Sequence, residues 1–345
     1  MTKLVDKTIG ISRPPTTYEK ICDVVFRSLS YTFAWLSVAL VVFIVYEIAV
    51  PARPALQKYG LSFIHGTTWD QNKNVYGILP QIWGTFYSSL LALLLGSILG
   101  LAVAVFLSER FLSSFVFQLL KPFGLQYRPY WRKLPDGLEV LLKNLVELLA
   151  AIPSVVYGLW GIFVIIPMIR PGCDWLHDNF KAIPLFSTSL GSGGMLPAAV
   201  VLAIMIVPTI SAIARDALVS VPPKLREAAY GLGATRWEAL FSVILPTARI
   251  GIFGAILLAF GRALGETMAL AMLVGGRNVI SPSLFSPADT LAALLASSFP
   301  EAGTNVELVG ALMSAALVLL AITLIVNLLG ALILQSSSRE RKGAR

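Results

Sequence analysis

The chain has 345 residues, of which 56% are hydrophobic and 13% are charged, and its net charge at neutral pH is +8. A soluble protein carries about 25% charged residues, so much of this chain is expected to lie in lipid. Its two cysteines and two histidines form no group with metal-ligand spacing, so we expect no disulfide framework, no metal site and no cofactor. The positive charge is attributed to membrane topology and not to nucleic-acid binding.

Six apolar stretches are long enough to cross a bilayer, which takes about 20 helical residues. In chain order they are predicted at 28–50, 83–107, 148–169, 194–214, 250–275 and 308–334. The fold class is therefore all-α, a polytopic membrane protein with six transmembrane helices. We divide the chain into a polar tail at 1–27, a membrane domain at 28–334 and a basic tail at 335–345.

Lysine and arginine are distributed unevenly among the segments that join these stretches. Most of them lie in the two tails and in the loops 109–143 and 215–249. Because cytoplasmic segments retain Lys and Arg, both termini are predicted to be cytoplasmic in a multi-pass membrane protein. On the outer side, 51–82 is expected to be a solvated loop. On the inner side, the amphipathic stretch 111–142 is expected to lie on the membrane surface.

The segment 222–246 is predicted to form two short helices within the cytoplasmic loop. Pro222 suits a helix start, where a missing N–H group costs least. Gly233 can adopt the left-handed conformation that ends a helix. Thr235 and Glu238 have the spacing of a capping box, which would start the second helix.

Both short helices have an apolar face by 3.6-residue periodicity. The residues are Leu225, Ala228, Ala229 and Leu232 on the first helix, and Trp237, Leu240, Phe241 and Ile244 on the second. Exposed amphipathic helices of this kind fit a groove in a partner. The alternative is an ordinary loop between two membrane helices.

Two charges interrupt the fifth apolar stretch. Arg262 and Glu266 are four residues apart, so a continuous helix would place them on one face. Arg262 would lie about 18 Å along the helix from Ile250, near the middle of a hydrocarbon core about 30 Å thick. A lone charge there costs at least about 2.5–3.5 kcal/mol, so both side chains should face the protein interior or water.

Two interpretations of this pair remain open. It is either a structural ion pair that holds neighbouring helices, or a site on the route of an anion. A guanidinium is a planar fork that suits phosphate oxygens. Glu266 would then hold Arg262 and keep the anion from binding too tightly.

The loop also resembles that of a known family. Glu227, Ala228, Ala229, Gly233, Leu245 and Pro246 are similar to the loop signature of ABC importer permeases of the MetI-like fold, with Val243 where isoleucine is usual. The resemblance implies a coupling helix that sits in a cleft of a separate ATPase. The chain has no phosphate-binding loop of its own, so it is not expected to be an enzyme.

Further motifs narrow the resemblance to the permeases of the Pst phosphate-uptake system, of the PstC rather than the PstA type. They lie at 74–80, 149–161, 202–208 and 260–270, with Trp69 and Asp70. The resemblance implies import of inorganic phosphate by alternating access, with Arg262 and Glu266 at positions needed for transport. It also implies a PstA-like permease partner, two PstB-like ATPase subunits and a periplasmic phosphate-binding protein. The loop 109–143 is longer than the family leads us to expect.

Rival functions remain. The same architecture serves permeases for sulfate, molybdate or phosphonate, and arginine binds all tetrahedral oxyanions. A passive anion channel or a membrane scaffold is a rival of a different class, against which the predicted docking loop argues. A membrane enzyme is disfavoured, because no nucleophile–base pair is evident.

Overall fold

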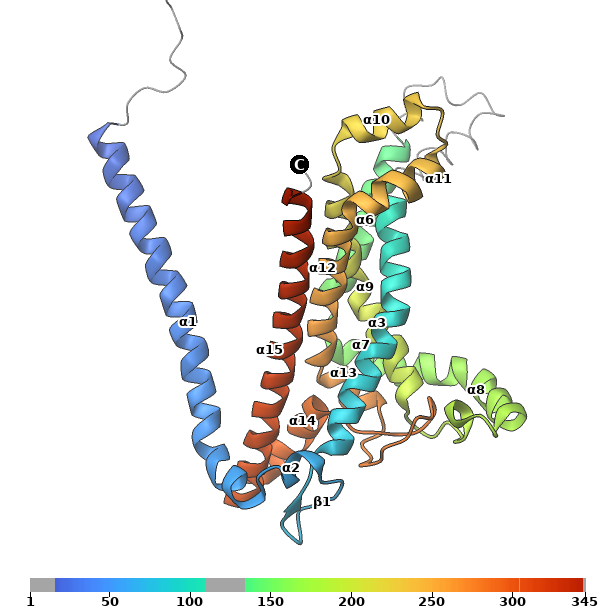
Figure 1. The fold of residues 1–345 in the computed structure, drawn as a ribbon. Helices are drawn as coiled ribbons and strands as arrows, with labels where there is room; N and C mark the ends of the chain where they lie inside the picture. The colour runs from blue at the N-terminus through green and yellow to red at the C-terminus, as the bar shows by residue number, and fades with distance from the viewer. Residues whose placement is uncertain (1–15, 110–133, 304, 344–345) are drawn as a thin grey trace, which may run out of the picture. The chain divides into compact units, whose positions relative to one another are not determined.

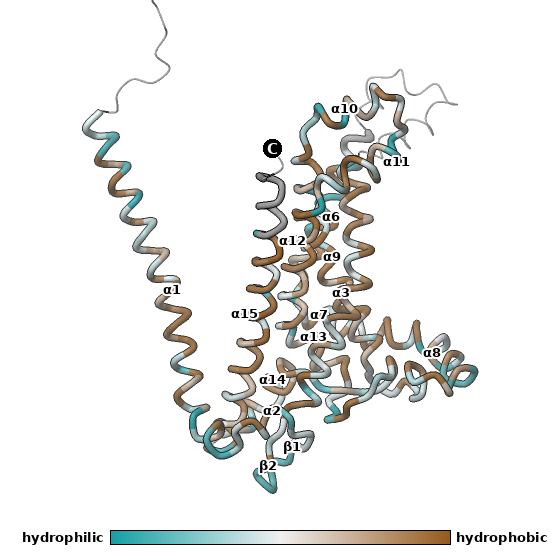
Figure 2. Tube along the Cα trace, viewed as in Figure 1, coloured by the Kyte–Doolittle hydropathy of each residue, from teal (hydrophilic) through white to brown (hydrophobic). Residues whose placement is uncertain are grey.

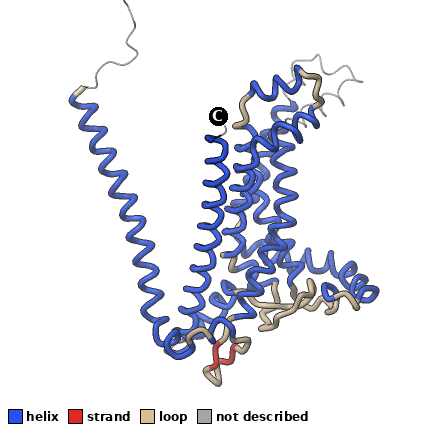
Figure 3. The backbone as a smooth tube through the Cα atoms, viewed as in Figure 1, coloured by secondary structure: helices blue, strands red, loops and turns tan. Residues whose placement is uncertain are grey.

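The computed structural model describes residues 16–109, 134–303 and 305–343. Within them the chain is almost entirely helical, with one two-stranded hairpin (Figure 3). It divides into two units, Met1–Pro51 and Ala52–Arg345.

The described part of the first unit is helical throughout. It belongs to α1 (Thr17–Tyr59), which starts well before the predicted first span. The hydroxyl groups of Ser30, Thr32 and Ser37 each donate to the carbonyl four residues earlier. These polar groups are therefore satisfied within the helix, as a lipid environment requires.

Six helical runs among the described residues are long and apolar enough to cross a membrane, which confirms the predicted number. They are Thr17–Tyr59, Leu79–Ser108, Ser154–Phe180, Met195–Val219, Arg236–Leu264 and Val306–Gln335. Apolar residues predominate along α3 (Leu79–Ser108), α9 (Met195–Val219) and α15 (Val306–Gly343), as Figure 2 shows.

The pairing of α3 with α9 forms the centre of the second unit. Small residues recur every fourth position on the buried face of α3, at Ser88, Ala92, Gly96, Gly100 and Ala104. A Cβ atom added at Gly96 would lie 2.7 Å from the Ile206 side chain, and one at Gly100 would lie 2.7 Å from that of Ile210. Membrane helices associate closely where small residues let their backbones approach, and this stripe accounts for the contact.

The third predicted span, 148–169, is wrong in its course, because the structure divides it at Ile152 and Pro153. Proline has no N–H donor and disfavours helical geometry in the residue before it. A separate helix, α6, precedes the break, and a helical run follows it. The elements are α6 (Leu134–Ala151), α7 (Ser154–Trp160), a π-helical turn (Gly161–Ile165) and α8 (Ile166–Phe180). Most of the amphipathic stretch predicted at 111–142 lies outside the described residues; its end belongs to α6.

The fifth predicted span, 250–275, is also interrupted. Helix α12 (Leu245–Leu264) ends eleven residues earlier than the predicted span, and the short helix α13 (Met268–Leu273) follows. Between them the backbone N–H of Gly265 bonds to the Arg262 carbonyl, which tightens the last turn of α12.

The segment predicted as a solvated outer loop is exposed at many of its residues, but other residues of it are packed against the protein. It contains the end of α1, α2 (Ser62–His65), β1 (Trp69–Asp70) and β2 (Val75–Tyr76), with Trp69 paired to Tyr76 in an antiparallel register. Phe63, Tyr76 and Ile78 are buried in one cluster with residues of α14 (Leu291–Ala302) and α15. The turn signals predicted the bends correctly but not the tertiary burial.

The remaining elements lie at the opposite end of the second unit from β1 (Figure 1). They are α10 (Pro223–Gly231), α11 (Arg236–Ala239) and a π-helical turn (Leu240–Ile244) that leads into α12. We call this the α10 end and the opposite one the β1 end. Helix α3 runs from the β1 end to the α10 end, and so does α9.

Candidate functional site

The two short helices predicted from the sequence are present at the α10 end. Gly233 has a φ of 86°, the left-handed conformation expected at the end of the first helix. The capping box is also formed. The Thr235 hydroxyl accepts a hydrogen bond from the Glu238 N–H at 3.3 Å, and the Glu238 carboxylate accepts one from the Thr235 N–H at 2.7 Å.

The apolar residues of this segment divide into an inner and an outer set. Ala229, Ala239, Leu240 and Ile244 are buried, and Leu240 and Ile244 join a cluster with the ends of α3 and α9. The outer set, which we call the loop surface, consists of Leu225, Tyr230, Leu232, Trp237 and Phe241. Leu232 is 90% exposed. The predicted apolar face of each helix is therefore partly buried, and only the outer residues remain available for a partner.

The other residues of the family-like loop motif lie close to this surface. Glu227 and Ala228 are exposed on α10, Leu245 is half-buried and Pro246 is exposed at the start of α12. The rings of Trp237 and Phe241 stack with their centroids 6.0 Å apart. The motif thus combines exposed apolar and polar groups on one pair of short helices.

Arg262 and Glu266 do not form the predicted pair. Arg262 lies in the last turn of α12, whereas Glu266 lies beyond its end, so the two do not share a helix face. In the part of the chain that the structure describes, no ion pair joins them. Instead Arg262 Nη1 donates a hydrogen bond to Thr209 Oγ1 of α9 at 3.2 Å. The interpretation as a structural ion pair is therefore not supported.

The surroundings of Arg262 are unusually polar for an apolar helix. The Thr267 hydroxyl bonds to the Gly265 carbonyl in the break after α12. On α15, the Asn327 side chain lies close enough to Gly261 that an added Cβ would be 2.9 Å from its Oδ1. Irregular backbone within a membrane is tolerated where it is buried in protein or lines a water-filled cavity.

The Arg262 side chain is exposed in the isolated chain. A cation at membrane depth does not face lipid without a large cost. The exposed guanidinium and the break beside it therefore mark a face that another subunit or a water-filled path must cover. Arg262 was predicted as a site residue from the sequence. The end of α12 at Gly265 was not predicted, because the hydropathy of the sequence does not reveal it.

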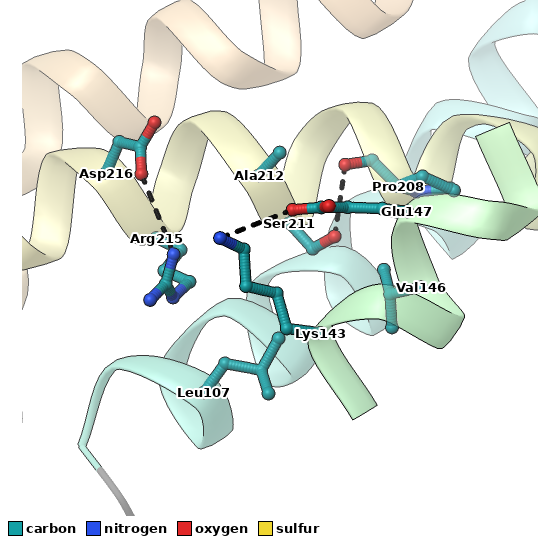
Figure 4. Close-up of a pocket in the computed structure, with 9 residues that line it drawn as sticks. All are labelled: Leu107, Lys143, Val146, Glu147, Pro208, Ser211, Ala212, Arg215 and Asp216. Carbon is teal, nitrogen blue, oxygen red and sulfur yellow. Dashed lines mark hydrogen bonds and ion pairs between the residues drawn. The ribbon is translucent and has the colours of Figure 1, made fainter. Parts of the chain in front are cut away.

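A pocket of about 110 Å³, lined by both charged and apolar side chains, lies between α6, α9 and the end of α3 (Figure 4). It is lined by Leu107, Lys143, Val146, Glu147, Pro208, Ser211, Ala212, Arg215 and Asp216. Its ion pairs, Lys143–Glu147 at 3.5 Å and Arg215–Asp216 at 3.9 Å, each join residues of one helix. Neither Arg262 nor Glu266 lines it, so the pocket is separate from the exposed cation.

A buried carboxyl group at the β1 end was not predicted. Asp289 is 9% exposed and precedes α14. Burial raises the pKa of Asp289 to about 6, although hydrogen bonds from the Thr290 N–H and the Gln81 side chain oppose the shift. Gln81 is itself buried, with an Oε1 atom that has no hydrogen-bond partner among the described residues. A single Asp in an ordinary loop sequence has no local pattern that would reveal this burial.

Six apolar helical runs, a pair of exposed short helices at one end and a cation exposed on an apolar face together define a membrane-embedded transport component. The chain belongs to the family of binding-protein-dependent transport system inner membrane components, whose profile matches residues 133–339. It is a membrane component of an ABC transporter, in which the ATPase is a separate subunit.

Within that family the relatives include permeases named PstC. The chain is 36% identical over 323 residues to the phosphate transport system permease protein PstC of Xylella fastidiosa strain Temecula1, covering 90% of this chain and 92% of that one. It is 36% identical over 323 residues to PstC of Haemophilus influenzae, covering 92% and 94%.

Solved structures share the fold at low identity. A bacterial ABC transporter involved in the import of the acidic polysaccharide alginate matches with a TM-score of 0.54 and 16% identity, covering 91% of this chain and 99% of that one. The MetNI methionine ABC transporter, in an inward-facing conformation, matches with a TM-score of 0.51 and 18% identity, covering 75% and 95%. These likenesses confirm the ABC importer permease fold.

Proposed function

We propose that the chain is the PstC-type permease subunit of an ATP-driven phosphate importer and moves inorganic phosphate across the bacterial inner membrane by alternating access. The observation that carries the proposal is the exposed Arg262 at the end of α12, in a chain whose relatives are phosphate permeases. A guanidinium with free donors binds a tetrahedral oxyanion at two oxygens. One hydrogen bond to Thr209 leaves such donors available.

The loop surface is the proposed contact with the ATPase. Its exposed apolar side chains resemble the anchors with which short helices fill a groove. This contact would include four of the motif residues, Glu227, Ala228, Gly233 and Pro246. The other two, Ala229 and Leu245, would pack behind them, on the side of the loop that faces the protein. ATP-driven closure of two PstB-like ATPase subunits would then move α10 and α11.

The orientation follows from the same assignment. If the α10 end is cytoplasmic, both termini are cytoplasmic too, in agreement with the distribution of Lys and Arg. The β1 end then faces the periplasm, where a phosphate-binding protein would dock. The face that carries Arg262 would contact a PstA-like partner. A water-filled path between the two permease subunits would then surround the guanidinium with water instead of lipid.

The test is phosphate uptake by a strain in which this system is the sole phosphate importer. We expect Arg262→Ala to reduce uptake to background while the ATPase subunit still co-purifies. Arg277→Ala serves as the matched control, since Arg277 is an exposed arginine outside the six candidate spans. Uptake by Arg262→Ala at the wild-type rate would refute the role of this residue.

The rival cargo is another oxyanion such as sulfate, molybdate or phosphonate. Excess unlabelled sulfate, molybdate or phosphonate should leave labelled phosphate uptake unchanged if the assignment to phosphate is correct. Uptake that persists without hydrolysable ATP would instead favour a passive channel.

A further inference from the structure

A nearly buried ion pair connects α10 to the end of α3. Arg226 Nη1 lies 2.7 Å from Glu109 Oε1, and the two side chains are only 21% and 7% exposed. The residues are 117 positions apart in the chain. Each of the other ion pairs among the described residues has at least one partner whose side chain is more than 40% exposed.

Arg226 also reaches a third element. Its Nη2 atom donates a hydrogen bond of 2.8 Å to the carbonyl of Leu218, in the last turn of α9. The Leu218 carbonyl also accepts a hydrogen bond of 3.3 Å from the Val221 N–H, so Arg226 adds a further donor at the α9 terminus. The planar guanidinium therefore fixes α10 to two helix ends in one geometry.

The position of Glu109 is unfavourable without this partner. Glu109 is the residue that follows α3, and its N–H still bonds to the Val105 carbonyl. A helix C-terminus carries partial negative charge, and a carboxylate placed there is repelled. The Arg226 guanidinium offsets both the charge of Glu109 and that of the α9 end. Loss of either partner would leave a charge that is largely withdrawn from water.

We propose that Arg226 and Glu109 form a rigid joint that passes movement of α10 to α3 and α9. The two helices are already held together along the small-residue stripe of α3, so a push at their shared end moves them as one body. The inference rests on the proposed docking of the ATPase at the loop surface. In this role Arg226 and Glu109 are positioning residues, since neither is placed on the path of the anion.

The joint makes a direct geometric prediction for the assembled complex. Spin labels at Ser108→Cys and Lys224→Cys would report the distance between the end of α3 and α10, with Cys22→Ser removing an exposed native thiol. The distance should be the same in the nucleotide-free and ATP-bound complexes. A change between the two states would overturn the proposal.

Two variants test what the joint does. Glu109→Gln removes the charge with little change of shape, and Arg226→Lys keeps the charge but loses the fork. Both should retain bound ATPase and hydrolyse ATP, while phosphate imported per ATP falls about fivefold or more. The control is Glu307→Gln, which breaks the exposed Lys58–Glu307 pair of 2.9 Å at the β1 end and should leave this ratio unchanged.

The possible results separate this inference from the proposed function. If the wild-type complex shows no ATP-dependent phosphate import, the proposed function fails. If the wild type imports phosphate and both variants do so with the same yield per ATP, only the joint is refuted. Should the variants not assemble, the spin-label distances in the otherwise unchanged complex still decide the question.

Discussion

Asp289 should make the protein less stable at neutral pH than in mild acid. Its carboxyl pKa rises from the ordinary 3.8 to about 6, because burial disfavours the charged form. The folded state therefore holds this proton more tightly than the unfolded state does. Stability is highest when both states are protonated, falls as pH rises from about 4 to about 6, and is then constant.

The size of the effect follows from the shift. At about 1.36 kcal/mol per pKa unit, a rise from 3.8 to about 6 corresponds to about 3 kcal/mol. About 1.4 kcal/mol of this penalty develops between pH ~5 and pH ~7.5. Asp289→Asn should remove it, and its amide would bring a donor close to the unpartnered Oε1 of Gln81.

The assay is thermal unfolding of the purified complex in detergent at both pH values. Asp289→Asn should raise the midpoint by a few degrees at the higher pH and change it little at the lower one. Glu301→Gln is the control, because it removes an exposed carboxylate from α14, which begins just after Asp289. A variant that unfolds earlier at pH ~7.5, or that keeps the full pH dependence of the wild type, would refute the reasoning.

Three further predictions concern packing and docking. Gly96→Val should destabilise the chain by about 1–3 kcal/mol, measured by thermal unfolding, because its side chain would overlap Ile206; an unchanged midpoint would contradict this packing. Thr235→Ala removes the capping hydrogen bond to the Glu238 N–H and should cost about 1 kcal/mol, seen as faster proteolysis of the loop than in the wild type. Leu232→Asp should leave the unfolding midpoint unchanged but reduce co-purified ATPase, and full recovery of ATPase would exclude this residue from the contact.

Features encoded by neighbouring residues were predictable from the sequence. Hydropathy identified the six spans, because twenty consecutive apolar residues have few alternatives to a membrane helix. The capping box and the left-handed Gly233 were found because they depend on residues within one or two turns. The predicted apolar face of α10 was only half right, since burial of Ala229 depends on elements distant in sequence.

Features that depend on tertiary contacts were missed. The break at Gly265 interrupts a run that remains apolar on both sides, so hydropathy does not report it. The partner of Arg262 proved to be Thr209 on another helix and not the nearby Glu266. The pairing of Arg226 with Glu109 joins positions with no relation in the sequence, and only the folded chain reveals it.

The exposed guanidinium of Arg262 also bears on how the transporter is made. Before a partner subunit covers it, a newly inserted chain must either expose this charge to lipid or leave the segment incompletely inserted. The cost is about 2.5–3.5 kcal/mol on insertion scales. An orphan copy therefore differs from an assembled one in a way that a membrane protease can recognise. We expect the chain to be short-lived when synthesised alone, and synthesis together with the proposed PstA-like partner would keep the amounts of the two chains in balance.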